Sequence, residues 1–160
     1  IRVGSTSESG ASFFVSFPAA ASARRPSPAP AQAPLPQTAA GSAVLVVEDE
    51  PALASAVAEA LRDAGYCVER AADGEAALEC VKAKVFDLVI CDLKMPRLDG
   101  PSFYRVLCER KPALARHVIF VTGDVAGTDS ERFLTETGCR WLPKPFRLND
   151  LLRVAHEVLG

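Results

Sequence analysis

Several polar residues stand where apolar runs of the sequence end, and their types suit the chemistry of a phosphoryl group. Glu48 and Asp49 follow the run AVLVV, Asp92 follows FDLVIC, Thr122 follows HVIFV, and Lys144 comes shortly after RWL. Carboxylates gathered in one pocket repel each other and raise each other's pKa, and a divalent cation removes that conflict. Because the ligand atoms on offer are all oxygens, the pattern predicts a magnesium site that retains water molecules.

An ionised Asp92 at such a site could attack a phosphorus atom. The ammonium of Lys144 and the metal would neutralise charge on the transferring group, and the hydroxyl of Thr122 would hydrogen-bond one of its oxygens. Gly123 has no side chain, which leaves access beside Thr122 for a phosphodonor. Phosphoryl transfer chiefly requires positioning and electrostatic stabilisation, and these residues could supply both.

Alternating strands and helices would bring these residues together. The predicted strands cover residues 43–47, 66–69, 86–91, 117–121 and 140–142. The predicted helices cover residues 51–64, 74–84, 101–111, 128–137 and 148–159. This alternation predicts an α/β fold in which a five-stranded parallel sheet is covered on both faces. In such a sheet the functional residues gather at the carboxyl ends of the strands.

Each of these residues also has an ordinary structural explanation. The acidic residues 48–50 could simply favour the start of a helix through its dipole. Asp92 could be a turn residue, Thr122 a hydroxyl at a strand end, and Lys144 a solvated loop lysine. These explanations are reasonable one at a time, but they do not account for the ordered placement of all of these groups at strand ends.

Four stretches of the sequence carry a family pattern in register. They are VLVVEDE (residues 44–50), DLVICDLKMPRLDG (87–100), VIFVTGD (118–124) and LPKPF (142–146). Their order, and the steps of 30 residues from Asp92 to Thr122 and of 22 from Thr122 to Lys144, belong to the same pattern. Together they resemble the receiver domain of two-component response regulators. The resemblance covers residues 42–160 and implies a flavodoxin-like, doubly wound sheet.

The resemblance implies a role for each acidic residue of the pocket. Asp92 would be the phosphorylation site. Asp49 would bind Mg²⁺ directly, and Glu48 would hold the metal mainly through water. The backbone carbonyl of Lys94 would be a further ligand.

Two more positions complete the resemblance. Thr122 and Lys144 would finish the active site, and Thr122 would also take part in a conformational switch. Trp141 stands where the family usually has Tyr or Phe as the switch aromatic, and its larger ring changes the space that an inward rotation needs. The implied partners are a histidine-kinase phosphodonor domain, in the same chain or in another, and a histidine phosphotransfer protein.

Residues 1–41 differ in character from the rest of the chain. Within residues 1–19, two β-prone stretches, 1–3 and 12–17, flank a segment rich in Gly and Ser, which predicts a hairpin. A hairpin needs further strands to be stable, so we expect it to belong to a domain that begins upstream. Residues 20–41 are dominated by Ala, Pro and Ser, and this composition predicts a semi-rigid linker.

Residues 1–18 resemble the last β-hairpin of a histidine-kinase ATP-binding domain, with Phe17 where that family usually has Leu. The nucleotide-binding boxes and the phosphorylatable histidine of such a kinase would lie upstream. A kinase tail, a linker and a receiver together resemble the end of a hybrid histidine kinase. The resemblance implies that this chain catalyses only its own phosphotransfer and dephosphorylation, and that the parent protein is the kinase.

Composition narrows the possible partners. The formal net charge is −2, with acids and bases mixed along the chain, so we expect neither nucleic acid nor a membrane surface as a direct partner. The five cysteines have no CxxC spacing, which favours buried thiols in a reducing compartment. We therefore expect a cytoplasmic location, and the sequence leaves open whether the parent protein is anchored in a membrane.

Three alternatives remain. The first is the receiver of a stand-alone or DNA-binding response regulator. A DNA-binding regulator needs a following effector domain, which we do not expect because the chain ends at Gly160. The second is a small-molecule enzyme on a similar sheet, for which the sequence holds no Gly-rich phosphate loop or nucleophile elbow. The third is a receiver-like module that is never phosphorylated, and the presence of all the acceptor residues argues against it.

Overall fold

Five parallel strands form the central sheet of the computed structural model, which describes residues 41–123 and 128–160. The strands are β1 (Ala43–Val47), β2 (Cys67–Ala71), β3 (Leu88–Asp92), β4 (Val118–Thr122) and β5 (Arg140–Pro143). They lie in the order β2-β1-β3-β4-β5, and all their pairings are parallel. The predicted α/β fold is confirmed as a doubly wound, flavodoxin-like sheet.

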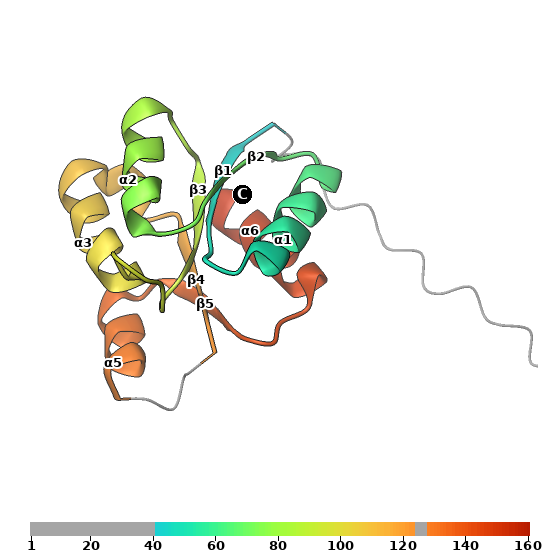
Figure 1. The fold of residues 1–160 in the computed structure, drawn as a ribbon. Coiled ribbons are helices and arrows are strands. Elements are labelled where there is room, and N and C mark those ends of the chain that lie inside the picture. Colours follow the sequence, from blue (N-terminus) through green and yellow to red (C-terminus); the bar gives the residue numbers. More distant parts are fainter. Residues whose placement is uncertain (1–40, 124–127) are drawn as a thin grey trace, which may run out of the picture. The chain divides into compact units, whose positions relative to one another are not determined.

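Helices cover both faces of this sheet. They are α1 (Pro51–Asp63), α2 (Gly74–Ala83), α3 (Gly100–Arg110), α4 (Pro112–Ala115), α5 (Thr128–Thr137) and α6 (Leu148–Leu159). Figure 1 shows α2 and α3 on one side of the strands and α1 and α6 on the other. The helical connections cross the faces of the sheet, so the strands all run in the same direction. Their carboxyl ends therefore lie along one edge of the sheet.

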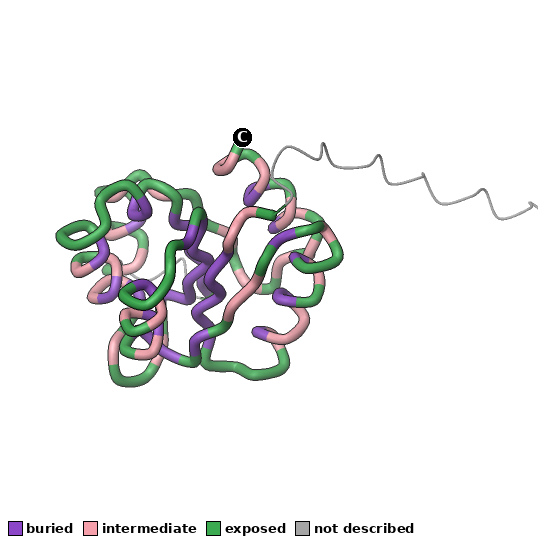
Figure 2. The backbone as a smooth tube through the Cα atoms, turned by 90° about the horizontal axis from the view of Figure 1, so that it is seen from above, coloured by how far each residue is buried: buried purple, intermediate pink, exposed green. Residues whose placement is uncertain are grey.

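The core has one layer on each face because side chains alternate along the strands. Leu45 and Val47 of β1 pack in the cluster that also holds residues of α2 and α3. Val44 and Val46 of the same strand pack with residues of α1 and α6. In Figure 2 the purple, buried segments concentrate along the central strands and the inner sides of the helices. The continuous apolar runs of the sequence therefore form strands that are buried on both faces.

The helix α4 was not predicted. We expected one helix over residues 101–111, whereas α3 ends at Arg110 and a further turn of helix begins at Pro112. Proline suits the first position of a helix because it has no N–H to leave unbonded. It cannot continue the preceding helix for the same reason, so a new turn starts there instead.

The other predicted elements are present with small shifts at their ends. The strand predicted over residues 66–69 begins and ends later, as Cys67–Ala71, and three strands end one residue further along than predicted. Asp92 and Thr122 are thus the last residues of β3 and β4. The predicted hairpin over residues 1–19 and the linker over 20–41 lie outside the described residues, apart from Gly41.

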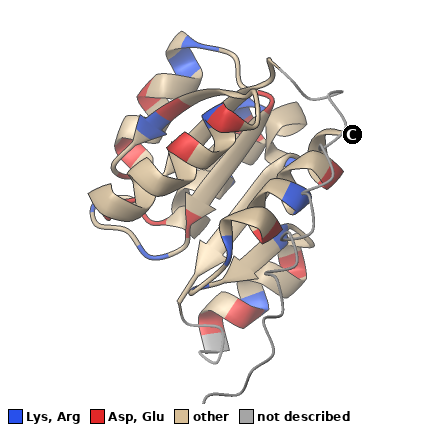
Figure 3. Cartoon of the chain, turned by 90° about the vertical axis from the view of Figure 1, so that its right-hand side faces the viewer, with Lys and Arg blue, Asp and Glu red and all other residues tan. Residues whose placement is uncertain are grey.

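The helices of the described ranges are too short or too polar to cross a membrane. Acidic and basic residues are interspersed along the helices, while the strands between them carry few of either (Figure 3). The two colours are mixed along the ribbon in this view, in keeping with the mixed charge pattern of the sequence.

Candidate functional site

The edge formed by the carboxyl ends of the strands carries a cluster of polar residues. Glu48 follows β1 directly, and Asp92 ends the neighbouring strand β3. The chain leaves β1 toward β2 on one side and leaves β3 toward β4 on the other. The connections therefore diverge between these two strands, which is where ligands bind in sheets of this kind.

Three carboxylates converge at this point. Glu48, Asp49 and Asp92 each offer an oxygen, and these oxygens all lie within 4.8 Å of one another. Glu48 and Asp92 are only 5% and 6% exposed, while Asp49 is exposed. Two buried acids and one exposed acid form an open, all-oxygen donor set that fits Mg²⁺ with water molecules in the remaining positions.

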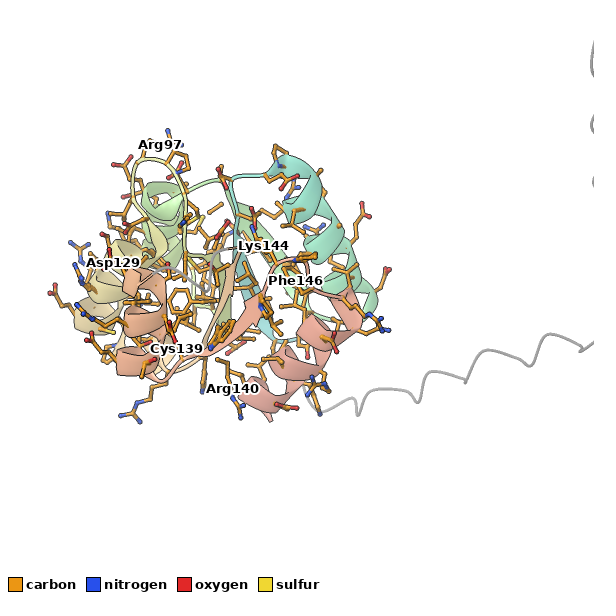
Figure 4. All side chains as sticks on the ribbon, turned by 90° about the horizontal axis from the view of Figure 1, so that it is seen from below. Arg97, Asp129, Cys139, Arg140, Lys144 and Phe146 are labelled. Carbon is orange, nitrogen blue, oxygen red and sulfur yellow. The ribbon has the colours of Figure 1, made fainter. Side chains whose placement is uncertain are left out.

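Lys144 supplies the positive charge that this cluster has in the structure. Its Nζ lies 2.8 Å from Oε2 and 3.1 Å from Oε1 of Glu48, and 2.6 Å from Oδ2 of Asp92. Figure 4 shows Lys144 toward the middle of the domain. The ammonium of Lys144 pairs with two of the three carboxylates, Glu48 and Asp92, so the cluster retains a negative charge that favours a divalent cation.

The pKa values of Glu48 and Lys144 reflect the close spacing of these charges. Burial raises the pKa of Glu48, and the negative charge of Asp92 adds to the rise, although hydrogen bonds from Lys144 and the backbone oppose it. Burial would lower the pKa of Lys144, but its hydrogen bonds to Asp92 and Glu48 and their charges outweigh this effect and raise it. The raised pKa of Lys144 keeps its ammonium charged, and burial makes the charge of Glu48 costly.

The second oxygen of Asp92 is held by the backbone. The N–H of Lys94 donates to Oδ1 of Asp92 at 3.1 Å. The backbone of Gly100 packs against the same residue, because a Cβ at Gly100 would lie 2.5 Å from the carbonyl oxygen of Asp92. Together with Lys144, these contacts fix the orientation of the carboxylate from both sides.

Thr122 and Trp141 lie on the adjacent strands. Thr122 is fully buried at the end of β4, and its carbonyl accepts the backbone N–H of Lys144 at 2.7 Å, which joins the two residues directly. Beside it a Cβ at Gly123 would meet nothing nearer than Cβ of Lys144 at 4.0 Å, so the space is open as expected. The indole of Trp141, on the edge strand β5, is 39% exposed.

The sequence profile of the response regulator receiver domain matches residues 44–156, which include all of the sheet except Ala43 and all the site residues just described. This chain belongs to the response regulator receiver family. The profile begins within β1 and ends within α6, so it covers the whole described domain apart from its two edges.

Curated relatives of the receiver include sensor kinases and transcriptional regulators. The receiver is 37% identical over 122 residues to the sensor kinase CckA of Brucella abortus, which covers 74% of this chain and 13% of that protein. It is 34% identical over 109 residues to the transcriptional regulatory protein DltR of Streptococcus agalactiae, covering 68% of this chain and 48% of that protein. The chain thus spans half or less of these relatives, and they differ in what the receiver is attached to.

Solved structures show the same fold. The receiver domain of the sensor histidine kinase PA1611 from Pseudomonas aeruginosa is 31% identical, with a TM-score of 0.68, covering 76% of this chain and 99% of that one. That structure contains a magnesium ion coordinated in its active site cleft. The chemotaxis regulator CheY4 of Vibrio cholerae is 30% identical with a TM-score of 0.66, covering 74% of this chain and 99% of that one.

The structure brings together most of the residues expected at the receiver's site. Glu48, Asp49, Asp92 and Lys144 meet directly, and Thr122 adjoins them through its backbone. The expected metal contact of the Lys94 carbonyl stays a prediction.

One ion pair near this site was missed, between Asp73 before α2 and Arg97 before α3. The sequence ADG before α2 could have indicated a helix cap at Asp73, but nothing in it pointed to Arg97.

Proposed function

We propose that Asp92 of this receiver accepts a phosphoryl group from a phosphohistidine, with Mg²⁺ held by Glu48, Asp49, Asp92 and the backbone carbonyl of Lys94. The observation that carries the proposal is the convergence of three carboxylates, two of them paired with the ammonium of Lys144, at the divergence of β1 and β3. A site built only to stabilise the fold would match its charges, whereas this one keeps an excess of negative charge on buried groups.

The chain's own residues would prepare Asp92 for attack. Lys144 and the N–H of Lys94 hold its two oxygens, so the carboxylate is oriented before a donor arrives. One of these oxygens forms a bond to phosphorus as the bond between phosphorus and the histidine nitrogen breaks, and the electron pair stays on the imidazole. Mg²⁺, when bound, would supply charge neutralisation between the anionic donor and the carboxylates. Lys144 would then turn toward the phosphoryl oxygens.

Thr122 and Trp141 would transmit the change. The backbone of Thr122 is bonded to that of Lys144, so a move of Lys144 toward the phosphoryl group would reach β4 directly. The hydroxyl of Thr122 would hydrogen-bond a phosphoryl oxygen, and Trp141 on β5 would adjust its ring to the new position. This makes the exposed edge of the sheet the place where phosphorylation is read out.

The parent protein would be a hybrid histidine kinase in the cytoplasm or facing it, with a histidine phosphotransfer protein as its downstream partner. The similarity to the sensor kinase CckA supports this context. Residues 1–19 would then be the end of the kinase's ATP-binding domain, 20–41 a linker, and 42–160 the receiver.

The second candidate is the receiver of a transcriptional regulator, which the similarity to DltR favours. The expectation that the protein has no nucleic-acid partner has no support among such relatives. The reading frame upstream of Ile1 and downstream of Gly160 separates the two candidates. An ATP-binding kinase core upstream supports the hybrid kinase, and a DNA-binding domain downstream would contradict it.

Loading with acetyl phosphate tests the acceptor role of Asp92. We expect loading to require Mg²⁺ and to be abolished in Asp92→Asn, while circular dichroism shows an intact fold. Asp63→Asn is the matched control, because Asp63 is an exposed aspartate at the end of α1. Loading of Asp92→Asn at the level of the unaltered protein would show that the acceptor lies elsewhere.

A further inference from the structure

The loop between β3 and α3, residues 93–99, connects the acceptor aspartate to a second part of the molecule. Its first residues adjoin the carboxylate cluster, where the N–H of Lys94 donates to Oδ1 of Asp92. Its base is closed by a hydrogen bond from the N–H of Gly100 to the carbonyl of Leu93 at 3.1 Å. The far side of the loop, at Arg97 and Leu98, contacts the start of α2.

Arg97 binds a carboxylate that is almost fully enclosed. Asp73 is 1% exposed, and its Oδ1 accepts the N–H of Ala76 at 2.9 Å as the N-terminal cap of α2. Its other oxygen, Oδ2, accepts a hydrogen bond from the guanidinium of Arg97. Arg97 itself is largely exposed and stands on the outer side of the loop in Figure 4. Both oxygens of this buried acid are therefore used, one by a helix and one by the loop.

The backbone of Arg97 would not be expected to adopt its conformation without such a contact. Its φ is +66°, in the left-handed region that favours glycine, and among non-glycine residues of the described ranges it is alone in this. The ion pair gives the loop a reason to hold an arginine there, because the side chain reaches Asp73 from that backbone position.

A second contact fixes the same side of the loop. The N–H of Gly74 donates to the carbonyl of Leu98 at 3.2 Å, and a Cβ at Gly74 would lie 2.5 Å from that oxygen. Glycine at this position allows the loop and the start of α2 to lie in direct backbone contact. The side-chain pair and the backbone pair together attach the loop to α2 at two neighbouring points.

We propose that Arg97, through its ion pair with Asp73, is a positioning residue for the metal and acceptor site. The inference rests on the proposed function, in which the loop supplies the N–H of Lys94 to Asp92 and the carbonyl of Lys94 to the metal. Among the described residues, the ion pair of Arg97 is with Asp73, which is not one of the proposed metal ligands. It holds the loop against α2, and the loop in turn holds the Lys94 backbone in place beside Asp92.

The direction in which the Mg²⁺ affinity changes when Arg97 is removed distinguishes a positioning role from a simple charge effect. Arg97 is a cation, so its removal would strengthen the binding of Mg²⁺ if its charge were all that mattered. A positioning role predicts the opposite, because a loosened loop presents its carbonyl less often in the right place. Outer contacts of this kind usually change metal affinity by about 10–100-fold, and we expect about tenfold here because the effect passes through the backbone.

The experiment is a magnesium titration of the whole chain, followed by the amide shifts around Asp92. The variants are Arg97→Gln, Arg97→Gly and Arg97→Lys, with Arg105→Gln on the exposed side of α3 as the matched control. We expect Arg97→Gln and Arg97→Gly to weaken binding by about tenfold. Arg97→Lys should recover most of the loss because it keeps a cation for Asp73, and Arg105→Gln should change nothing.

Glycine at position 97 isolates the ion pair from backbone strain. It adopts a positive φ freely, so Arg97→Gly removes the side chain without adding steric strain. Loss of affinity in Arg97→Gln alone, with Arg97→Gly as tight as the unaltered protein, would overturn the proposal in favour of a backbone effect. Unchanged or tighter binding in both variants would overturn it as well. Hydrogen exchange gives a second readout, since the amides of Gly74 and Lys94 should exchange faster in Arg97→Gly.

Asp49→Asn, titrated in parallel, keeps the two proposals apart. If Asp49→Asn weakens binding and the Arg97 variants do not, the metal site stands and the positioning role of Arg97 is wrong. If Asp49→Asn binds magnesium as well as the unaltered protein, the proposed metal site is wrong and the inference about Arg97 is overturned with it.

Discussion

A single buried carboxylate, Asp73, and a cluster of three carboxylates lie on either side of the loop before α3, and they differ in how their charge is matched. Asp73 meets one guanidinium and one backbone N–H, so each of its oxygens has a donor. Glu48 and Asp92 share the ammonium of Lys144, and Asp49 adds a third carboxylate beside them. The first group is balanced and joins two segments of the chain, whereas the second is left with excess negative charge.

This difference shows how to tell a structural acid from a reactive one in the same fold. Both Asp73 and Asp92 are buried near the carboxyl end of a strand, so neither burial nor position distinguishes them. What distinguishes them is whether the positive partner is shared: Arg97 pairs with Asp73, whereas Lys144 pairs with both Asp92 and Glu48. Breaking a matched ion pair destabilises the folded protein. A surplus of like charges destabilises the folded protein as long as it is unneutralised, and it favours the binding of a cation or, with that cation, a phosphoryl group.

The largest effect on stability should come from the balanced group. Asp73→Ala should lower the free energy of unfolding by about 2 kcal/mol, since it removes a helix cap and the partner of Arg97 together. Denaturant unfolding measures this, with Glu75→Ala, an exposed position in the first turn of α2, as the control. Equal stability of the two variants would mean that the ion pair does not fasten the loop.

Removing the ammonium should sharpen the contrast at the reactive group. Lys144→Met should raise the affinity for Mg²⁺ by about fivefold, because a nearby cation in a partly wet site opposes the metal by about 1 kcal/mol. Lys84→Met, which alters a surface pair with Glu69, is the control and should leave the affinity unchanged. Weaker magnesium binding in Lys144→Met would indicate that Lys144 organises the carboxylates more than it competes with the metal.

The smallest effect is expected for Asp92→Asn, and its change in the free energy of unfolding should have the opposite sign to that of Asp73→Ala. Without metal, Asp92→Asn should raise the free energy of unfolding by about 1 kcal/mol, because it removes one of the mutually repelling charges. Lys144 keeps its two contacts to Glu48 in that variant. Thermal unfolding in the presence of a chelator measures the change against Asp63→Asn. A loss of stability as large as that of Asp73→Ala would remove the distinction between the two groups.

Much of the sheet and of the carboxylate cluster could be predicted from the sequence because the buried strands are continuous apolar runs. The apolar runs that form β1, β3 and β4 are buried on both faces, and their last residues mark the edge at which Glu48, Asp92 and Thr122 meet. The rule that strand ends gather was enough to bring together groups that are distant in the chain.

The parts that escaped prediction depend on backbone geometry or on single turns. A four-residue helix such as α4 leaves no periodic pattern to recognise. An arginine in the sequence does not indicate a positive φ, so the turn at Arg97 could not be predicted. Its contact with Asp73 could not be predicted for the same reason. The exposed edge strand β2 was placed early because Tyr66, which packs in the core just before it, reads as a strand residue.

The central claim concerns one atom group, the carboxylate of Asp92, and it can be read directly on the unaltered protein. The receiver is loaded by a phosphohistidine donor in the presence of Mg²⁺ and then treated with borohydride, which reduces an acyl phosphate to an alcohol and so converts the modified aspartate to homoserine. Mass spectrometry of the peptides should find homoserine at position 92 and at no other. Homoserine at another aspartate, or phosphate that persists on a residue resistant to reduction, would contradict the account.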